Sequence, residues 1–154
     1  MYKRQREQDY LSLYELEPPY IVNGTVPPLG EWSRRGQGTV QPVAVGDMLK
    51  GVAGSPGRAT GTARILLNLA DPTRLEPDDI LIAPSTDPSW TPLFLVAGAV
   101  VTDIGAVGTH AVIVSRELGI PCVPSIADAT KRIPDGATIT VDGSLGTVTI
   151  DALP

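Results

Sequence analysis

The chain has 154 residues, which is enough for one domain with a sizeable core and too few for several catalytic domains. Its net charge of −5, with only 12 Lys and Arg residues, argues against nucleic acid as a partner. The single cysteine, Cys122, and the single histidine, His110, exclude an internal disulfide and have no spacing typical of a metal site, so we expect no bound metal.

Residues 1–46 differ in composition from the rest of the chain. Clustered charges are followed by "PPYIVNGTVPPLGEWSRRGQGTVQP", in which repeated Pro and Gly favour extended or turn conformations. Only residues 10–16 have the pattern of a short helix. We therefore predict that 1–46 is a linker or docking arm, poorly ordered when the chain is alone, and that 47–154 is the folded domain.

Neither a secretory signal nor a membrane span is predicted. The N-terminus lacks a continuous apolar stretch with a small-residue cleavage site, and the longest apolar run, Leu93–Val101, is too short to cross a bilayer. With one cysteine, the chain suits a reducing compartment, so we expect a soluble cytoplasmic protein with no membrane partner.

Short apolar segments separated by turn signals follow residue 47. Alternation in "ATGTARILLN" predicts a strand, and further buried strands are predicted at Ile80–Ala83 and Ala99–Thr102. "THAVIVSRELG" is typical of a helix with Thr109 as N-cap and Gly119 as its end.

The last third of the chain predicts three more elements. "IPCVPSI" indicates a strand, "ADATKRI" a helical turn, and "ATITVDGSLGTVTI" a hairpin of β-branched residues around Asp142–Gly146. Helices and strands that alternate without a regular βαβ rhythm favour an α+β fold or a layered β/β/α domain.

His110 falls at the predicted start of the helix. A helix N-terminus offers unpaired N–H groups that stabilise a phosphoryl group, and a neutral imidazole has a ring nitrogen with a free lone pair. His110 is therefore a candidate nucleophile for covalent phosphoryl transfer, with Gly105 and Gly108 allowing a tight turn and close approach by a partner. A lone histidine at such a position is, however, more often a capping residue, and the local pattern leaves both interpretations open.

A resemblance favours the nucleophile. "TDIGAVGTHAVIVSRELGIPCV" resembles the phosphohistidine signature of the phosphoenolpyruvate (PEP)-utilising enzymes, T-D-x-G-G-x-x-S-H-A-x-x-x-A-R-E-x-G-I-P-A-V. "APSTDPSWTPLF" resembles the T-D-P-x-W-x-P segment of PEP synthase and rifampicin phosphotransferase. "GVAGSPGRATGTARIL" and "DATKRIPDGATITVDGSLGTVTI" are also similar, so four segments between about Leu49 and Ile150 match in the same order.

The resemblance implies a mobile, swivelling β/β/α phosphohistidine domain whose histidine, here His110, carries phosphate between two other domains. Thr109 stands where the family usually has Ser, and its hydroxyl would cap the helix or bind the phosphoryl group. Asp103 would orient the imidazole or stabilise the turn, Gly105 would support the loop, and Arg116 suits a structural or docking role because it lies six residues from His110. Trp90 is expected to be a buried packing residue.

Four residues depart from the family's pattern: Ala106 replaces a glycine, Ser115 an alanine, Ser125 a glycine, and Gly108 a threonine through which some dikinases are regulated by phosphorylation. Ala106 is compatible with activity only where its backbone does not need a positive φ.

The chain is too short to contain the nucleotide-binding and acceptor-binding domains that the resemblance implies. ATP and Mg²⁺ are expected in the partner ATP-binding domain, with no cofactor bound here, so the chain is predicted to be one component of a phosphotransferase. Whether the acceptor is pyruvate, a rifamycin or another compound depends on a separate acceptor-binding domain. The alternative is a non-catalytic docking or binding module with the swivelling fold.

Overall fold

A computed structural model of the chain describes residues 10–11, 13–18, 24–34 and 41–154. Contacts within the chain divide it into two units, Met1–Thr39 and Val40–Pro154. Parts of the predicted arm (1–9, 12, 19–23 and 35–40) lie outside the described residues. Val43, which the sequence placed in the arm, is buried in the core of the second unit.

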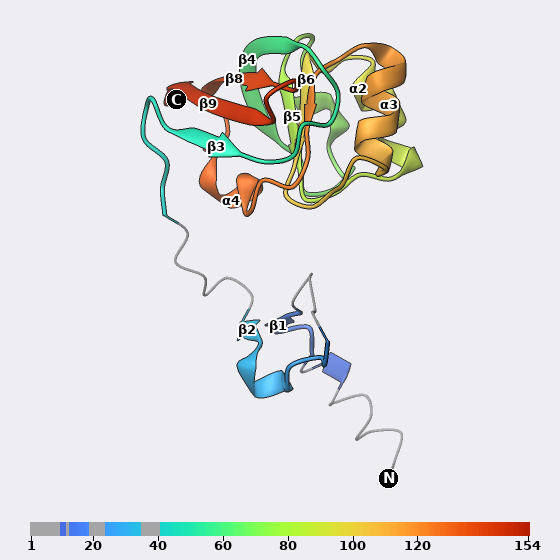
Figure 1. The fold of residues 1–154 in the computed structure, drawn as a ribbon, viewed down its shortest axis with the longest axis vertical. Helices are drawn as coiled ribbons and strands as arrows, with labels where there is room; N and C mark the ends of the chain where they lie inside the picture. Colours follow the sequence, from blue (N-terminus) through green and yellow to red (C-terminus); the bar gives the residue numbers. More distant parts are fainter. Residues whose placement is uncertain (1–9, 12, 19–23, 35–40) are drawn as a thin grey trace. The chain divides into compact units, whose positions relative to one another are not determined.

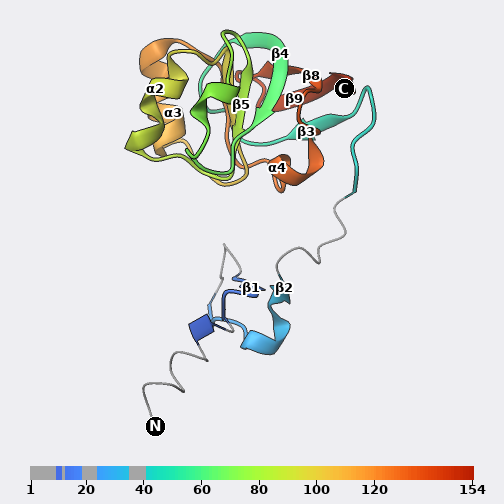
Figure 2. The same cartoon turned by 180° about the vertical axis from the view of Figure 1, so that it is seen from behind.

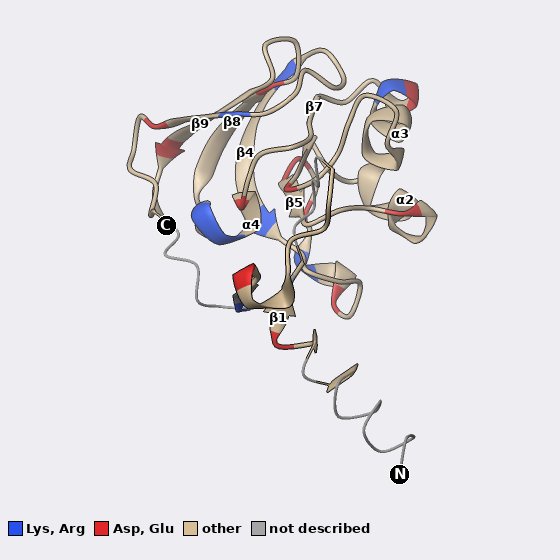
Figure 3. Ribbon diagram, turned by 60° about the horizontal axis from the view of Figure 1, so that its bottom comes forward, with Lys and Arg blue, Asp and Glu red and all other residues tan. Residues whose placement is uncertain are grey.

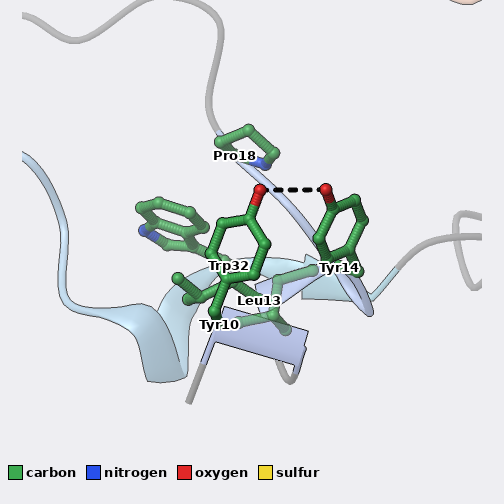
Figure 4. Close-up of a pocket in the computed structure, with 6 residues that line it drawn as sticks. Tyr10, Leu13, Tyr14, Pro18 and Trp32 are labelled. Atoms are coloured by element: carbon green, nitrogen blue, oxygen red, sulfur yellow. Dashed lines mark hydrogen bonds between the residues drawn. The ribbon is translucent and has the colours of Figure 1, made fainter. Parts of the chain in front are cut away.

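The first unit is small. Tyr10, Leu11 and Leu13 are helical, and strand β1 (Leu16–Glu17) pairs antiparallel with β2 (Ser33–Arg34), with a short 3₁₀ turn at Leu29–Glu31 between them. A shallow pocket is lined by side chains that are mostly apolar (Figure 4): Tyr10, Leu13, Tyr14, Leu16, Pro18 and Trp32. No described side chain of this unit is fully buried.

The second unit is built on a seven-stranded sheet in the order β3-β9-β8-β4-β5-β6-β7. Neighbouring strands are antiparallel in the half β3-β9-β8-β4 and parallel in the half β4-β5-β6-β7. The strands are β3 (Met48–Lys50), β4 (Arg58–Ile65), β5 (Ile80–Ala83), β6 (Ala99–Thr102), β7 (Cys122–Val123), β8 (Thr138–Asp142) and β9 (Thr147–Ala152). The helices are α2 (Thr91–Phe94), α3 (His110–Leu118) and α4 (Ala129–Arg132), with 3₁₀ turns η2 (Pro72–Arg74) and η3 (Pro88–Trp90).

Alternation along β5 shows how the layers are arranged. Ile80 and Ile82 pack into a core shared with the antiparallel strands, whereas Leu81 and Ala83 pack into a second core shared with α2 and α3. Figures 1 and 2 show the same order, with α2 and α3 on one side of β5 and β6, and β3, β8 and β9 on the other. The predicted α+β fold with β/β/α layers is confirmed.

The parallel half differs from the sequence-based expectation. The segment 84–98 connects β5 to β6, and α3 connects β6 to β7, so both connections are βαβ crossovers. The expected lack of βαβ rhythm was wrong here. The reason is length, since α2 has four residues and is too short to show a helical period in the sequence.

Residues 51–55 close the sheet. Gly51 N–H donates to Gly146 O beside β9, and further along the same segment Ser55 exchanges hydrogen bonds with Cys122 of β7, the strand at the opposite end of the sheet. The approach is close: a Cβ on Gly143 would lie 1.8 Å from Ser55 O. Only glycine fits at position 143.

Among the described residues, no helix has both the length and the apolar character needed to cross a membrane.

Candidate functional site

α3 places His110 at its first residue. Thr109 has extended backbone angles (φ −79°, ψ 159°) and occupies the N-cap position, and Gly119 ends the helix with a left-handed φ of 71°. Ala111, Val112 and Ser115 are buried against the parallel strands. His110 itself is half-buried.

Three side chains from the segment after β5 surround the imidazole. Thr86 Oγ1 lies 3.0 Å from Nδ1, and Thr91 Oγ1 lies 3.3 Å from Nε2. The ring of buried Phe94 meets the imidazole edge-on, with 5.6 Å between ring centroids. The site is therefore formed where the η3–α2 segment contacts the start of α3.

Thr109 does not act as the expected side-chain cap. Its hydroxyl donates to Ala106 O at 2.8 Å and accepts no helix N–H, although its carbonyl accepts from the N–H groups of Val112 and Ile113. The N–H groups of His110 and Ala111 have no acceptor among the described residues. These two groups are available to an anion at the helix start.

Asp103 faces α4 and not the imidazole. Its two carboxylate oxygens accept hydrogen bonds from the backbone N–H (2.8 Å) and the hydroxyl (2.5 Å) of Thr130. Burial raises the pKa of Asp103, and the Thr130 bonds offset part of that effect. Because both ring nitrogens of His110 face threonines, the proposed orientation of the imidazole by Asp103 was wrong. The carboxylate instead ties the end of β6 to α4 through Thr130.

Gly105 is required by packing. A Cβ there would lie 2.7 Å from Pro124 Cβ, whereas a Cβ on Gly108 would meet nothing within 4 Å. Neither glycine has a positive φ, and Ala106 is not among the residues that do. The replacement of glycine by Ala106 therefore carries no backbone strain. Ser125, the other replaced glycine, is left-handed with φ 64°.

Arg116 is tied to the loop that closes the sheet. Its Nε donates to Gly54 O at 2.9 Å, joining α3 to residues 51–55. This contact supports the structural role expected for Arg116.

The surroundings of His110 are nearly free of charge. Residues 104–115 contain no Asp, Glu, Lys or Arg, and such residues occur in α3 only near its C-terminal end, at Arg116 and Glu117 (Figure 3). Asp87 follows Thr86, and its pKa is lowered mainly by hydrogen bonds from Ser89 and least by the charge interaction with His110. A phosphoryl group here would be stabilised by N–H and hydroxyl dipoles.

Neither a metal site nor the cysteine thiol offers a second reactive centre among the described residues. The described residues contain no group of three potential metal ligands from His, Cys, Asp and Glu. Cys122 is buried in β7, and burial raises the pKa of its thiol to about 11, so it stays protonated. Trp90 is buried, which confirms its expected packing role.

Sequence reasoning did not identify Thr86 and Thr91. Both lie within "STDPSWTP", a segment that the resemblance had already singled out, on either side of Trp90. The signal was therefore present, but only the fold brings this segment to the imidazole.

Comparisons with known proteins agree on one family. Residues 75–146 match the family model described as PEP-utilising enzyme, mobile domain. The chain is 41% identical to the prodigiosin synthesizing transferase PigC of Serratia marcescens, 38% to phosphoenolpyruvate synthase of Aeropyrum pernix and 36% to rifampicin phosphotransferase of Streptomyces sviceus, each over 96% of this chain. It spans only 16%, 19% and 16% of those proteins.

The fold also occurs outside these relatives. A chain in the crystal structure of Thermococcus kodakaraensis aconitase X matches with a TM-score of 0.54 at 20% identity, covering 68% of this chain and 98% of that one. At this identity the match concerns the fold alone.

Proposed function

Through residues 75–146 the chain belongs to the family of the PEP-utilising enzyme mobile domain, and we propose that its second unit carries a phosphoryl group on His110 between two other domains. The observation that supports this most directly is the placement of the only histidine. His110 is half-buried at the first residue of α3, beside two threonine hydroxyls and two N–H groups that find no acceptor within the described part of the chain.

The chemistry is a double displacement at phosphorus. The lone pair of a ring nitrogen attacks the phosphoryl donor, an N–P bond forms, and the P–O bond to the leaving group breaks with its electron pair retained by that oxygen. An acceptor oxygen then attacks the same phosphorus, and the N–P bond breaks to return the electron pair to the ring. The N–H groups of His110 and Ala111 would stabilise the phosphoryl oxygens throughout.

Donor and acceptor are proposed to reside on partner domains, because this chain is less than a fifth of the length of the relatives above. An ATP-binding domain would supply the phosphoryl group with Mg²⁺, and an acceptor-binding domain would receive it, as part of a phosphotransferase of the PEP synthase or rifampicin phosphotransferase type. The unit would swivel between them. The single buried thiol suits the reducing cytoplasm.

The test is phosphorylation of the 154-residue chain by the ATP-binding domain of a related enzyme, added in trans with ATP and Mg²⁺. We expect one phosphoryl group per chain by intact mass, lost in acid and stable in base. His110→Ala should abolish it without loss of folding, because the ring is only half-buried. Several related donor domains are needed to allow for imperfect docking.

Two results would reject the carrier function: label that persists in His110→Ala, or no label with any donor, including a cognate one. Either would leave the non-catalytic docking module as the alternative.

A further inference from the structure

The hydrogen bonds around His110 define the position of the ring proton. A neutral imidazole has one N–H donor and one lone-pair acceptor, and each ring nitrogen here faces a threonine hydroxyl. A hydroxyl can donate only one proton, so the direction of each bond follows from where that proton is already used.

Thr91 has already used its proton. Its hydroxyl donates to Pro88 O at 2.8 Å, and a carbonyl oxygen can only accept. Towards Nε2, at the longer distance of 3.3 Å, Thr91 Oγ1 therefore presents a lone pair. A favourable contact requires that Nε2 carries the proton.

Thr86 completes the arrangement at the other nitrogen. With the proton on Nε2, the lone pair on Nδ1 accepts from the Thr86 hydroxyl at 3.0 Å. Both ring nitrogens and both threonine hydroxyls then have a hydrogen-bond partner. With the proton on Nδ1, the lone pairs of Nε2 and Thr91 Oγ1 would face each other unless Thr91 released Pro88. Phe94 packs edge-on against the ring and limits its rotation.

We propose that Thr86 and Thr91 are positioning residues that hold His110 as the Nε2–H tautomer, with the Nδ1 lone pair covered by the Thr86 hydroxyl. In this resting state neither nitrogen is free to attack. On the proposed function, docking of a phosphoryl donor has to displace the Thr86 hydroxyl so that Nδ1 can attack, or move the ring proton from Nε2 to Nδ1 so that Nε2 can attack, which would limit reaction with water or the wrong donor.

The tautomer can be measured directly because His110 is the only histidine. In the full chain labelled with ¹⁵N-histidine, long-range ¹H–¹⁵N spectra of the neutral ring report which nitrogen is protonated. We expect a single Nε2–H form in the wild type, without the averaging between tautomers that a free imidazole shows.

Three variants separate the two threonines. Thr91→Val removes the acceptor at Nε2, so the tautomer ratio should shift about fivefold or more towards Nδ1–H, with Thr86 Oγ1 as the new acceptor. Thr91→Ser keeps the hydroxyl and should restore the wild-type spectrum, which also controls for folding. Thr86→Val should keep the proton on Nε2 and move only the Nδ1 signal towards that of a bare nitrogen.

The inference is overturned by a wild-type proton on Nδ1, by averaged wild-type tautomers, or by a Thr91→Val spectrum identical to wild type. None of these measurements uses a phosphoryl donor. Normal labelling with an averaged ring would reject the tautomer and leave the carrier function, whereas the expected spectra without any labelling would reject the carrier function alone.

Discussion

The two glycines that flank Ala106 and Val107 provide a matched pair of substitutions in one loop. Gly105→Ala introduces a Cβ 2.7 Å from Pro124 Cβ, about 1 Å closer than a normal carbon–carbon contact. Pro124 is buried and its ring cannot rotate away, so the loop itself has to move. Overpacking of this kind costs about 1–3 kcal/mol of unfolding free energy.

Gly108→Ala adds the same methyl group to open space. Nothing lies within 4 Å of its Cβ and its φ is not positive. We expect stability to be unchanged or raised by about 0.4–1 kcal/mol, because alanine reduces the entropy of the unfolded chain. The structure thus predicts opposite effects for two chemically identical substitutions three residues apart.

Urea unfolding followed by tryptophan fluorescence measures both effects. A Trp32→Phe background leaves Trp90, in the core that α2 and α3 share with β5 and β6, as the only tryptophan. Gly105→Ala should lower the midpoint without changing the slope. In the labelling assay Gly108→Ala should reduce phosphorylation despite intact stability, since its methyl group projects where a donor would approach. Equal stabilities for the two variants would refute the packing argument.

The remaining predictions concern neighbouring residues. Thr109→Ala should cost about 1 kcal/mol through the lost bond to Ala106 O, measured by urea unfolding, and a cost near zero would contradict that bond. Burial raises the pKa of Asp103, so this residue should contribute most to stability at pH values below the ordinary aspartate pKa of about 4, and less as pH rises through its raised pKa. Asp103→Asn should remove this pH dependence of the urea midpoint. A pH profile that is the same in the variant and the wild type would contradict the prediction. Ser125→Gly should raise stability by about 0.5–1 kcal/mol by relieving the left-handed φ of 64°, and a lower thermal midpoint would be inconsistent with strain there.

The elements that the sequence predicted well are those with strong local signals. The strands at Ile80–Ala83 and Ala99–Thr102 match β5 and β6 residue for residue, because uninterrupted apolar runs end at polar turns. The helix begins at His110 and ends at Leu118, with Thr109 and Gly119 at the N-cap and C-cap positions, as the sequence predicted. What the sequence did not reveal is the order of strands, since closure by residues 51–55 depends on long-range pairing.

In the site too, local sequence signals pointed to some residues and not to those that only the fold brings together. His110 was singled out because it is the only histidine and stands at a predicted helix start, and the resemblance, not the local pattern, favoured it as the nucleophile. Its real partners, Thr86 and Thr91, come from a separate segment, and threonine is too common a residue to stand out without the fold. Asp103, seven residues from His110, was a candidate either to orient the imidazole or to stabilise the turn, and its carboxylate accepts hydrogen bonds from Thr130.

The distribution of charge around His110 bears on how a carrier of this kind would work. Residues 104–115 contribute no cation, and the guanidinium of Arg116 is engaged with Gly54 O. A phosphoryl group on His110 would therefore rely, within this unit, on N–H and hydroxyl groups, which stabilise an anion by about 1.5–3 kcal/mol each at most. On the proposed function, the remaining negative charge has to be balanced by cationic side chains or Mg²⁺ on whichever domain is docked. Weak stabilisation by the carrier itself favours onward transfer, because a phosphoryl group held tightly on His110 would raise the barrier to the second displacement.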